Sequence, residues 1–428
     1  MDPNSEEALA MLATSLRRIE DFLGLLPGPL VGDSRARLAR VRLLMLEKRP
    51  PVLALVGRRG AGKSSLVNAF FGGNVATIGH LRAQTASGKY YDYTSDRGVL
   101  TILDTRGMQE GSKPAGEAGE ARVRGTALDS LLNEVGKKCP DLLLFLVKAS
   151  ELDAAVDPDL DALEHIVREV ERVHRRRPQI LGLVTHCDLL EPKGVALDRP
   201  TSGTPEEREE KLAWVAAAER ELVSKIKSRG TLAPHLAFVM GVASYLSFTA
   251  EGRIRSDERW RIGELAARLF EHLPEEAKAT FARVAQVKRL QEDIAIDLTR
   301  VIAGLTSIVA ATPVPVADLI PITSLQLSLV AIIAWLGGRS LDGKAASEFL
   351  TALGINVGAA YVFREGARAL VKFVFPGAGS VVSGIVAFSG TMAIGAAARA
   401  YFLQHAPIEE AKAAYAAERD KKHEPPAS

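Results

Sequence analysis

The sequence has few cysteines and almost no excess charge. Only two of its 428 residues are cysteine, Cys139 and Cys187, which excludes a disulfide-stabilised scaffold and favours a reducing compartment. The formal net charge of +2 gives no electrostatic argument for a nucleic-acid partner. The first ten residues, MDPNSEEALA, are acidic rather than apolar and indicate no secretory signal peptide. We therefore expect a cytoplasmic protein.

The residue patterns of two common kinds of catalysis are also missing. The eight histidines are scattered along the chain, without the cysteine and histidine spacing of a zinc site. Ser64 and Ser65 have no partners that would complete a Ser-His-Asp triad. We therefore expect neither zinc chemistry nor a serine nucleophile.

Charged residues become scarce in one long region, from Val301 to Ala398. The average composition hides this region, because 47% hydrophobic and 25% charged residues are usual for a chain that buries a core. The length predicts two to three domains. We expect N-terminal helices at 1–49, an alternating region at 50–272, an apolar helical region at 273–403, and a charged helix with a polar tail at 404–428.

Residues 50–272 alternate apolar runs with helical patterns. Such alternation predicts an α/β fold with a mostly parallel, six-stranded sheet that helices cover on both faces. The expected strands are 52–56, 89–93, 99–103, 142–147, 180–184 and 237–240. The expected helices are 63–71, 117–135, 159–174, 205–228 and 258–272.

Helical patterns also occupy the flanks of this region. Two helices are expected before residue 50, the second at Asp33–Lys48, and a charged amphipathic helix is expected at 273–300. The second helix carries arginines among its leucines. Its basic face is either the solvated side of a helix packed on the next domain or a contact with anionic lipid.

A glycine-rich motif follows the first expected strand and opens the next helix. It fits the pattern GxxxxGK[ST], in which backbone N–H groups surround phosphate oxygens and the helix N-terminus adds its positive dipole end. Lys63 would reach the β- and γ-phosphates, and Ser64 would bind Mg²⁺. The alternative, a chance glycine-rich turn, fits this strand-to-helix context poorly. The motif residues are Gly57, Arg58, Arg59, Gly60, Ala61, Gly62, Lys63, Ser64 and Ser65.

Two further motifs distinguish guanine from adenine nucleotides. The strand at 99–103 runs into a DxxG motif, where Asp104 would hold the Mg²⁺ shell through water and the Gly107 N–H would sense the γ-phosphate. A later strand runs into Thr185-His186-Cys187-Asp188, where Asp188 would pair with the guanine N1 and 2-amino groups. Adenine has neither donor. Each motif is weak alone, but the three in this order predict a GTP site.

With these motifs the chain resembles the translation-factor-related P-loop GTPases, particularly the Era-like and dynamin-like branches, over about residues 50–272. The resemblance implies a Mg²⁺-dependent GTPase in which a threonine of the first switch closes on the metal and the γ-phosphate. Thr85 fits this role best and Thr77 is the second choice, while an ordinary loop threonine is the alternative for Thr85. The resemblance also implies a loop that reads guanine O6, which fits Val242-Ala243-Ser244.

Three positions depart from this family's pattern. His186 stands where a lysine usually stacks on the base, so weaker guanine selectivity is expected. Arg106 replaces the common proline or alanine, and Met108 stands where Ras-like proteins have a water-orienting glutamine. Intrinsic hydrolysis should then be slow unless an arginine neutralises the developing charge; the candidates are Arg58, Arg59 and Arg106. We hypothesise that Arg59 acts in cis after G-domain dimerisation, and the alternative is a solvated loop arginine.

The apolar region has two interpretations. Val301–Gly338 holds one charge, Asp318, and three prolines that divide it into segments near the length of a short membrane span. Phe373–Ala398 is uncharged and rich in glycine. These segments are either membrane-associated helices or mutually buried helices of a soluble domain. Asp318 is either a helix N-cap or a buried functional carboxylate.

This region also resembles the helical domain of unknown function that follows the G domain in YcjF-like bacterial proteins. The shared residues are Pro315 to Asp318, Ile320 to Ile322, Leu325 and Gln326. The resemblance implies a bacterial GTPase with a membrane-directed or switchable helical module. We expect the protein in the cytoplasm, at the cytoplasmic face of the membrane.

Two main hypotheses follow from the sequence. The first is a GTP-hydrolysing switch whose GTP and GDP states change the exposure or packing of the apolar helices, with membrane lipids and a second G domain as partners. The second is a soluble scaffold that binds nucleotide with little turnover, which Met108 motivates. An ATPase is a third and weaker option, because His186 departs from the guanine motif.

Overall fold

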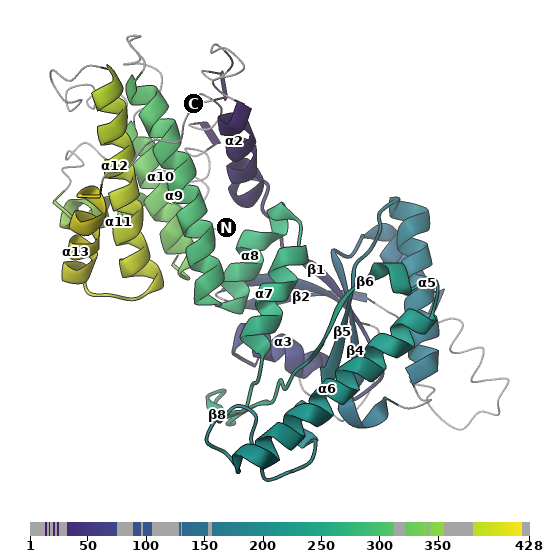
Figure 1. The fold of residues 1–428 in the computed structure, drawn as a ribbon. Helices are drawn as coiled ribbons and strands as arrows, with labels where there is room; N and C mark the ends of the chain where they lie inside the picture. Colours follow the sequence, from purple (N-terminus) through teal and green to yellow (C-terminus); the bar gives the residue numbers. More distant parts are fainter. Residues whose placement is uncertain are drawn as a thin grey trace. The chain divides into compact units, whose positions relative to one another are not determined.

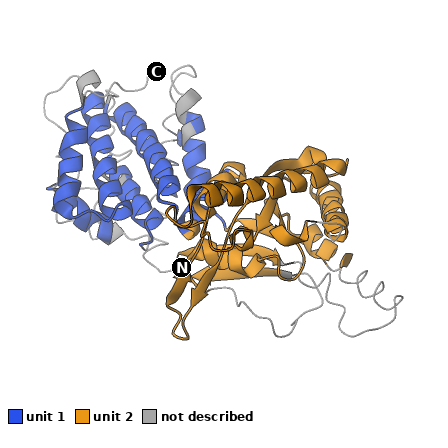
Figure 2. Ribbon diagram, turned by 60° about the horizontal axis from the view of Figure 1, so that its bottom comes forward, with its two compact units in different colours: residues 1–49, 275–283, 287–428 blue, residues 50–274, 284–286 orange. Residues whose placement is uncertain are grey.

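The computed structural model describes residues 32–74, 89–95, 97–104, 128–129, 131–152, 156–311, 322–339, 343–354 and 380–421, together with a few positions between residues 13 and 24. The chain divides into two compact units (Figure 2). The helical unit comprises residues 1–49, 275–283 and 287–428, and the α/β unit comprises residues 50–274 and 284–286. Along the sequence, the α/β unit therefore separates two parts of the helical unit.

A six-stranded sheet forms the centre of the α/β unit (Figure 1). Its strand order is β2-β3-β1-β4-β5-β6, and every neighbouring pair is parallel except β2 with β3. The strands are β1 (Val52–Val56), β2 (Lys89–Ser95), β3 (Gly98–Asp104), β4 (Leu142–Lys148), β5 (Ile180–Thr185) and β6 (Leu236–Gly241). The predicted α/β fold with a mostly parallel sheet is confirmed.

Continuous apolar sequence explains the central strands. Nearly every residue of β1, β4 and β5 is buried, as expected where both faces of a parallel sheet are covered. Apolar residues of α5 (Asp157–His174) recur at three- and four-residue spacing and therefore form one buried stripe. Helix α6 (Pro205–Ser228) contributes to the same core. The helical members of this core include Leu160, Leu163, Ile166, Val170, Val215, Leu222 and Ile226.

The structure corrects one helix boundary of the α/β unit and adds a hairpin. The expected helix at 258–272 is wrong in its first turn, because α7 spans Ile262–His272. Trp260 instead exchanges two backbone hydrogen bonds, of 2.9 and 3.2 Å, with Ala243. The strands β7 (Leu246–Phe248) and β8 (Ile254–Asp257) form a small antiparallel sheet in the segment between these two residues. Helices α3 (Lys63–Phe71) and α6 have the predicted bounds, and most of the predicted helix at 117–135 lies outside the described residues.

The described part of the helical unit contains only helices and their connections. They are α2 (Gly32–Met45), α8 (Glu275–Ala285), α9 (Lys288–Ala311), α10 (Ile322–Leu336), α11 (Gly343–Ala352), α12 (Ser380–Ala398), a π-helical turn at Arg399–Leu403 and α13 (Ile408–Arg419). The single helix expected at 273–300 is wrong. Gln286 adopts a left-handed backbone conformation, with φ of 48°, and thereby separates α8 from α9.

Helices α9 and α12 pack closely and share buried hydroxyl groups. A Cβ atom on Gly395 of α12 would collide with the side chain of Thr299 on α9. The Thr306 and Thr391 hydroxyls lie 3.0 Å apart, and the Gln326 amide of α10 donates to Thr391 at 3.1 Å. Polar contacts therefore join α9, α10 and α12 inside an otherwise apolar core.

Ion pairs hold α2 to α8 and α9 within the helical unit. The Arg40 guanidinium lies 3.2 Å from Glu275 and 3.1 Å from Asp297. Arg49, just after α2, contacts Glu276 twice, through a side-chain ion pair of 3.1 Å and a backbone hydrogen bond of 2.9 Å. Part of the basic face of α2 is therefore engaged with carboxylates of the same unit.

The Trp335 ring of α10 lies close to two cations of the helical unit. The Lys48 ammonium lies 5.0 Å from the centre of a Trp335 ring, and the Arg283 guanidinium lies 4.9 Å from it. Both distances are within the range of cation–π attraction. Burial, together with the charge of Arg283, lowers the pKa of Lys48 to about 8.

Candidate nucleotide-binding site

The predicted phosphate loop connects β1 to α3, as the motif requires. Gly57, Gly60 and Gly62 all have positive φ angles, of 152°, 80° and 88°, a conformation that favours glycine. A Cβ atom on Gly57 would collide with the Leu146 carbonyl of β4. These glycines are therefore required by the backbone path and by the close approach of the neighbouring strand.

Lys63, the first residue of α3, crosses back over this loop. Its side chain is buried, and its ammonium donates to the carbonyl of Gly57 and, at 2.9 Å, to the carbonyl of Arg58. The charge is thus held inside the loop at the positive end of a helix. That combination favours an anion such as a phosphate group.

Thr185, at the end of β5, links the base motif to the phosphate loop. Its hydroxyl lies 2.9 Å from the Ala61 carbonyl and 3.3 Å from the Val147 carbonyl of β4. The side chain is buried. Two motifs that are far apart in the sequence therefore lie next to each other, because they follow parallel strands that end at the same edge of the sheet.

His186 occupies a left-handed backbone position, with φ of 57°. Its Nδ1 atom lies 3.0 Å from the Thr185 hydroxyl, and a Cβ atom on Gly62 would lie 3.3 Å from its Cε1 atom. Burial lowers the pKa of His186, and Lys148 adds to this effect while Asp188 and Glu151 oppose it. The ring is therefore uncharged at neutral pH.

Cys187 and Asp188 begin a short 3₁₀ turn after His186. Cys187 is fully buried, its thiol lies 3.2 Å from the Val184 carbonyl, and burial raises its pKa to about 12. Asp188 is half-buried. The cysteine is therefore a structural residue of the turn, whereas the carboxylate that follows it remains within reach of solvent.

The second predicted base loop, Val242-Ala243-Ser244, lies beside the first. The Val242 N–H donates to Val184 at 2.8 Å, and the Cys187 N–H donates to Val242 at 3.3 Å. All three residues of the loop are buried. The structure therefore brings the residues expected at the guanine base into one place, at the ends of β5 and β6.

Two charged residues of α6, Lys211 and Glu219, organise these loops and were not predicted. Lys211 donates to three backbone carbonyls of residues 188–195, and Glu219 accepts from the Gly241 N–H at 2.6 Å. The sequence contains one signal for the lysine. Lys211 lies in register with Val215, Leu222 and Ile226 on the buried side of the helix, where an apolar residue would be expected.

The two loop arginines have different surroundings. The Arg58 guanidinium lies 3.1 Å from the buried carboxylate of Asp159 and 3.9 Å from Glu151. Arg59 is exposed. The side chain of Arg58 is therefore half-buried and engaged in a local ion pair, whereas Arg59 is more exposed to solvent.

The predicted metal and γ-phosphate residues are described only in part. Asp104 ends β3, in register with Leu55 of β1, so its backbone lies beside the strand that leads into the phosphate loop. Ser64 lies in the first turn of α3 and is half-buried. The remaining candidates for this part of the site lie outside the described residues: Thr77, Thr85, Arg106, Gly107 and Met108.

A Mg²⁺ ion fits the donor set at this position. Among the described residues there is no cluster of three or more histidine, cysteine, aspartate or glutamate side chains that could hold a metal. A magnesium ion at a nucleotide needs no such cluster, since it is held by one or two protein oxygens, phosphates and water. Ser64 and Asp104 are the oxygen donors that the sequence motifs predict for this ion.

Comparison with known proteins is consistent with this geometry. Residues 52–185 match the family model described as 50S ribosome-binding GTPase. The uncharacterized protein YfjP of Escherichia coli (strain K12) is 32% identical over 142 residues, which are 33% of this chain and 43% of YfjP. The tRNA modification GTPase MnmE of Xanthomonas campestris pv. campestris (strain B100) is 29% identical over 140 residues, which are 33% of this chain and 27% of MnmE. The chain thus spans less than half of the length of these relatives.

Solved structures of GTPases are also similar to the chain. Toc33 from Arabidopsis thaliana, in complex with Mg²⁺ and GMPPNP, is 14% identical, with a TM-score of 0.32 and coverage of 61% of this chain and 95% of Toc33. The family match and the order of motifs along the sheet carry the assignment. The chain therefore contains a P-loop GTPase domain, which the family match places over residues 52–185.

Proposed function

We propose that the chain is a Mg²⁺-dependent GTP-hydrolysing switch, in which the nucleotide state of the GTPase domain changes the packing or exposure of the helical unit. In this proposal the backbone of residues 57–65 surrounds the phosphates, and Lys63 contacts the β- and γ-phosphates. Ser64, Asp104 and Thr85 supply the Mg²⁺ site. Gly107 senses the γ-phosphate.

The proposed guanine contacts come from the two adjacent base loops. Asp188 accepts from N1 and the 2-amino group, while the uncharged His186 ring stacks on the base. Ala243 and Ser244 face O6, and Thr185 holds the base loop against the phosphate loop through its 2.9 Å contact with Ala61. Competition between GTP and ATP for the same site tests this assignment. Equal affinity for the two nucleotides would contradict it.

The coupling between the two units rests on one observation, the contact between Arg49 and Glu276. Both residues belong to the helical unit, and each stands where the chain passes between the units. Two prolines separate Arg49 from β1, the strand that enters the phosphate loop, and Glu276 lies in α8, which begins directly after Pro274 of the α/β unit. A change at the phosphate loop thus has a short covalent path to a contact inside the helical unit.

Trp335 provides a direct test of this coupling. The sequence contains three tryptophans, and Trp335 is the one in the helical unit. In a Trp214→Phe, Trp260→Phe variant, exchanging GDP for a non-hydrolysable GTP analogue should change the Trp335 emission, because Lys48 and Arg283 contact its ring. Charge reversal at Glu276 (Glu276→Lys) should abolish the change while leaving nucleotide affinity intact. Identical spectra with both nucleotides would contradict the switch.

We further propose that the helical unit associates with membrane lipids at the cytoplasmic face. Within the described residues, one helical stretch, Gly384–Leu403, is long and apolar enough to cross a membrane, and 56% of it is buried. Ile385 and Val386, near its start, are exposed. Flotation with liposomes, in the presence of GDP or of a GTP analogue, tests this proposal. Negligible binding in both states would reject lipid association.

The second candidate, a soluble nucleotide-binding scaffold, is favoured by the contacts of α12. Gly395 packs directly on Thr299, and Thr391 shares a hydrogen-bonded cluster with Thr306 and Gln326. Such contacts suit a helix buried among protein neighbours. A single-turnover assay at high protein concentration separates the candidates, since hydrolysis no faster than in buffer would favour the scaffold.

For the switch, we propose that hydrolysis accelerates when two GTPase domains meet and Arg59 neutralises charge in cis. Arg59 lies in the phosphate loop between two of its glycines and is exposed to solvent. Arg59→Ala should remove the dependence of the specific hydrolysis rate on protein concentration. An Arg175→Ala variant, which changes an exposed arginine outside the loop, serves as the control. Unchanged concentration dependence in Arg59→Ala would contradict this role.

A further inference from the structure

Lys211 is an ammonium group enclosed by protein. Its side chain is 0% exposed, and the Nζ atom lies 2.7 Å from the carbonyl of Asp188, 3.2 Å from that of Pro192 and 2.8 Å from that of Val195. Three acceptors match the three protons of an ammonium group. Burial lowers the pKa of Lys211, while the nearby charges of Asp188 and Glu191 oppose that shift.

The acceptors of Lys211 are the backbone of one loop. This loop contains no regular strand or long helix between Asp188 and Val195, and its own backbone hydrogen bonds are short-range ones, such as Leu190 N–H to the Cys187 carbonyl and Val195 N–H to the Pro192 carbonyl. One of the three carbonyls is that of Asp188 itself, the residue proposed to read the guanine. An uncompensated buried charge is costly. The loop carbonyls therefore compensate the buried charge of Lys211, and the ammonium in turn fixes the loop. Without the ammonium, the backbone that carries the Asp188 side chain would lose these three hydrogen bonds.

Glu219 holds the other base loop from the same helix. Its Oε1 atom accepts from the Gly241 N–H at 2.6 Å and from Arg261 at 2.9 Å. Gly241 directly precedes Val242-Ala243-Ser244. A Cβ atom on Gly241 would come within 2.6 Å of Val215, which lies between Lys211 and Glu219 on the buried face of α6. The start of the 242–244 loop therefore packs directly against α6 and is hydrogen-bonded to it.

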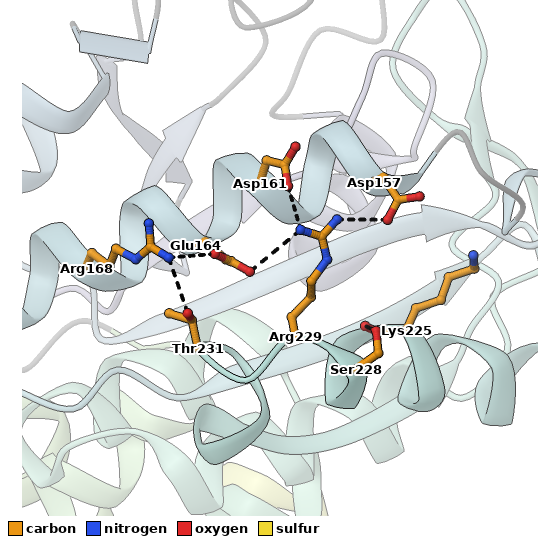
Figure 3. A network of polar contacts seen from close by, with 8 residues as sticks. All are labelled: Asp157, Asp161, Glu164, Arg168, Lys225, Ser228, Arg229 and Thr231. Atoms are coloured by element: carbon orange, nitrogen blue, oxygen red, sulfur yellow. Dashed lines mark hydrogen bonds and ion pairs between the residues drawn. The ribbon is translucent and has the colours of Figure 1, made fainter.

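Helix α6 is itself fixed at both ends. Its N-terminus has a capping box, in which the Thr204 hydroxyl accepts from the Glu207 N–H and the Glu207 carboxylate accepts from the Thr204 N–H. At the other end, Arg229 contacts three carboxylates of α5, at 2.9 Å from Asp157, 2.7 Å from Asp161 and 3.8 Å from Glu164 (Figure 3). The helix is thus a rigid support, and Lys211 and Glu219 lie about two turns apart on it.

We propose that α6 sets the base specificity of the nucleotide site, with Lys211 as the positioning residue of the Asp188 loop and Glu219 as the positioning residue of the 242–244 loop. This inference rests on the proposed guanine contacts of those loops. Neither residue touches the nucleotide. Both act by fixing backbone groups, so their removal should affect recognition of the base and spare recognition of the phosphates.

The test compares three probes that differ in the hydrogen-bond donors they offer to the Asp188 carboxylate. GDP offers both N1–H and the 2-amino group, inosine diphosphate lacks the 2-amino group, and pyrophosphate has no base. Loss of a hydrogen bond to a charged group lowers affinity about tenfold or more, so the wild-type chain should bind GDP at least about tenfold more tightly than inosine diphosphate. In Lys211→Met this ratio should fall towards one, while pyrophosphate affinity stays within about twofold of the wild-type value.

Matched controls lie on the same helix. Lys227→Met removes an exposed lysine and Glu210→Gln an exposed glutamate, and both should keep the wild-type ratio. Glu219→Gln keeps the size of the side chain and serves where Lys211→Met does not fold. The Glu219→Gln substitution weakens the hydrogen bond from the Gly241 N–H. It should lower GDP affinity about threefold to tenfold, again with unchanged pyrophosphate affinity.

Three outcomes would overturn the inference, and they are distinguishable. A wild-type chain that binds GDP and inosine diphosphate equally would refute the proposed guanine contacts, and the inference with them. A wild-type chain that discriminates, together with a Lys211→Met variant that keeps the full ratio and a Glu219→Gln variant that keeps the wild-type GDP affinity, would leave the guanine contacts in place and refute the positioning role. Equal loss of affinity for all three probes would likewise refute it, because general destabilisation produces that result.

Discussion

Replacing Gly395 by alanine should destabilise the helical unit, although alanine is the better helix former. Gly395 lies inside α12, and a Cβ atom there would collide with both the hydroxyl and the methyl group of Thr299 on α9. Helix propensity alone would make the substitution stabilising by about 1 kcal/mol. Overpacking of a well-packed core costs about 1–3 kcal/mol. Since the contacted atoms belong to a short side chain whose hydroxyl donates to the Ala295 carbonyl at 2.6 Å, the upper part of that range applies, and the net loss should be about 1–2 kcal/mol.

The same helix provides a control for this prediction. Gly390 is also inside α12, but a Cβ atom there would meet nothing within 4 Å. Gly390→Ala should therefore stabilise the unit by up to about 1 kcal/mol through propensity alone. The two substitutions are chemically identical and should have opposite signs.

Urea unfolding, followed by Trp335 fluorescence in the Trp214→Phe, Trp260→Phe background, measures the effect in the helical unit. A reporter confined to one unit is needed because a chain of two units does not unfold in a single two-state step. Thr299→Ala should relieve the collision, so Gly395→Ala and Thr299→Ala together should cost at least about 1 kcal/mol less than the sum of the two changes. If Gly395→Ala stabilised the unit as Gly390→Ala does, or if the two changes were additive, the close packing of α9 and α12 would be refuted.

Three further predictions concern single residues. Asp188→Asn should shift nucleotide preference from GDP towards xanthosine diphosphate by about tenfold or more, because the amide donates where the carboxylate accepts; unchanged preference in a competition assay would contradict the proposed contact. In the native protein at pH 8 only Cys139 should react with a disulfide reagent, because Cys187 is buried with a pKa raised to about 12, and both thiols should react after unfolding; rapid titration of two thiols in the native state would be inconsistent with this. Lys48 has a pKa of about 8 in the folded protein, against an ordinary value of 10.5, so below pH 8 its positive charge lowers the free energy of unfolding. The free energy of unfolding should rise between about pH 8 and 10.5, because the folded protein loses this proton at a lower pH than the unfolded chain does. Lys48→Met should remove most of that rise in pH-dependent denaturation, and an unaltered rise would count against the burial of this amine.

The central strands could be predicted because their environment is uniform. β1, β4 and β5 are buried on both faces, so a continuous apolar run is enough to locate them. The phosphate loop could also be predicted from the sequence, because a strand, a glycine-rich turn and a helix each have a local sequence pattern. The first turn expected for α7 was wrong because Trp260 pairs with Ala243 through backbone groups, and backbone pairing between distant residues leaves no periodic signal in the sequence.

Other features depend on contacts that no local pattern contains. The break at Gln286 arises from a single left-handed residue that is not glycine, so the helical periodicity on both sides suggested one continuous helix. Lys211 is buried only because three carbonyls of a distant loop surround it. The sequence places a lysine on an apolar helical face, but only the tertiary structure identifies the acceptors.

The division of the helical unit along the chain has a consequence for synthesis on the ribosome. Helix α2 buries Leu38, Val41, Leu44 and Met45, and it packs against α9, which is translated only after the whole GTPase domain. During that interval the apolar side of α2 lacks its partner in the nascent chain. A fragment ending at residue 274 would keep this helix without its partner, whereas one spanning Pro50 to Pro274 would omit it. The GTPase domain should therefore be more soluble when expressed without the first 49 residues than with them.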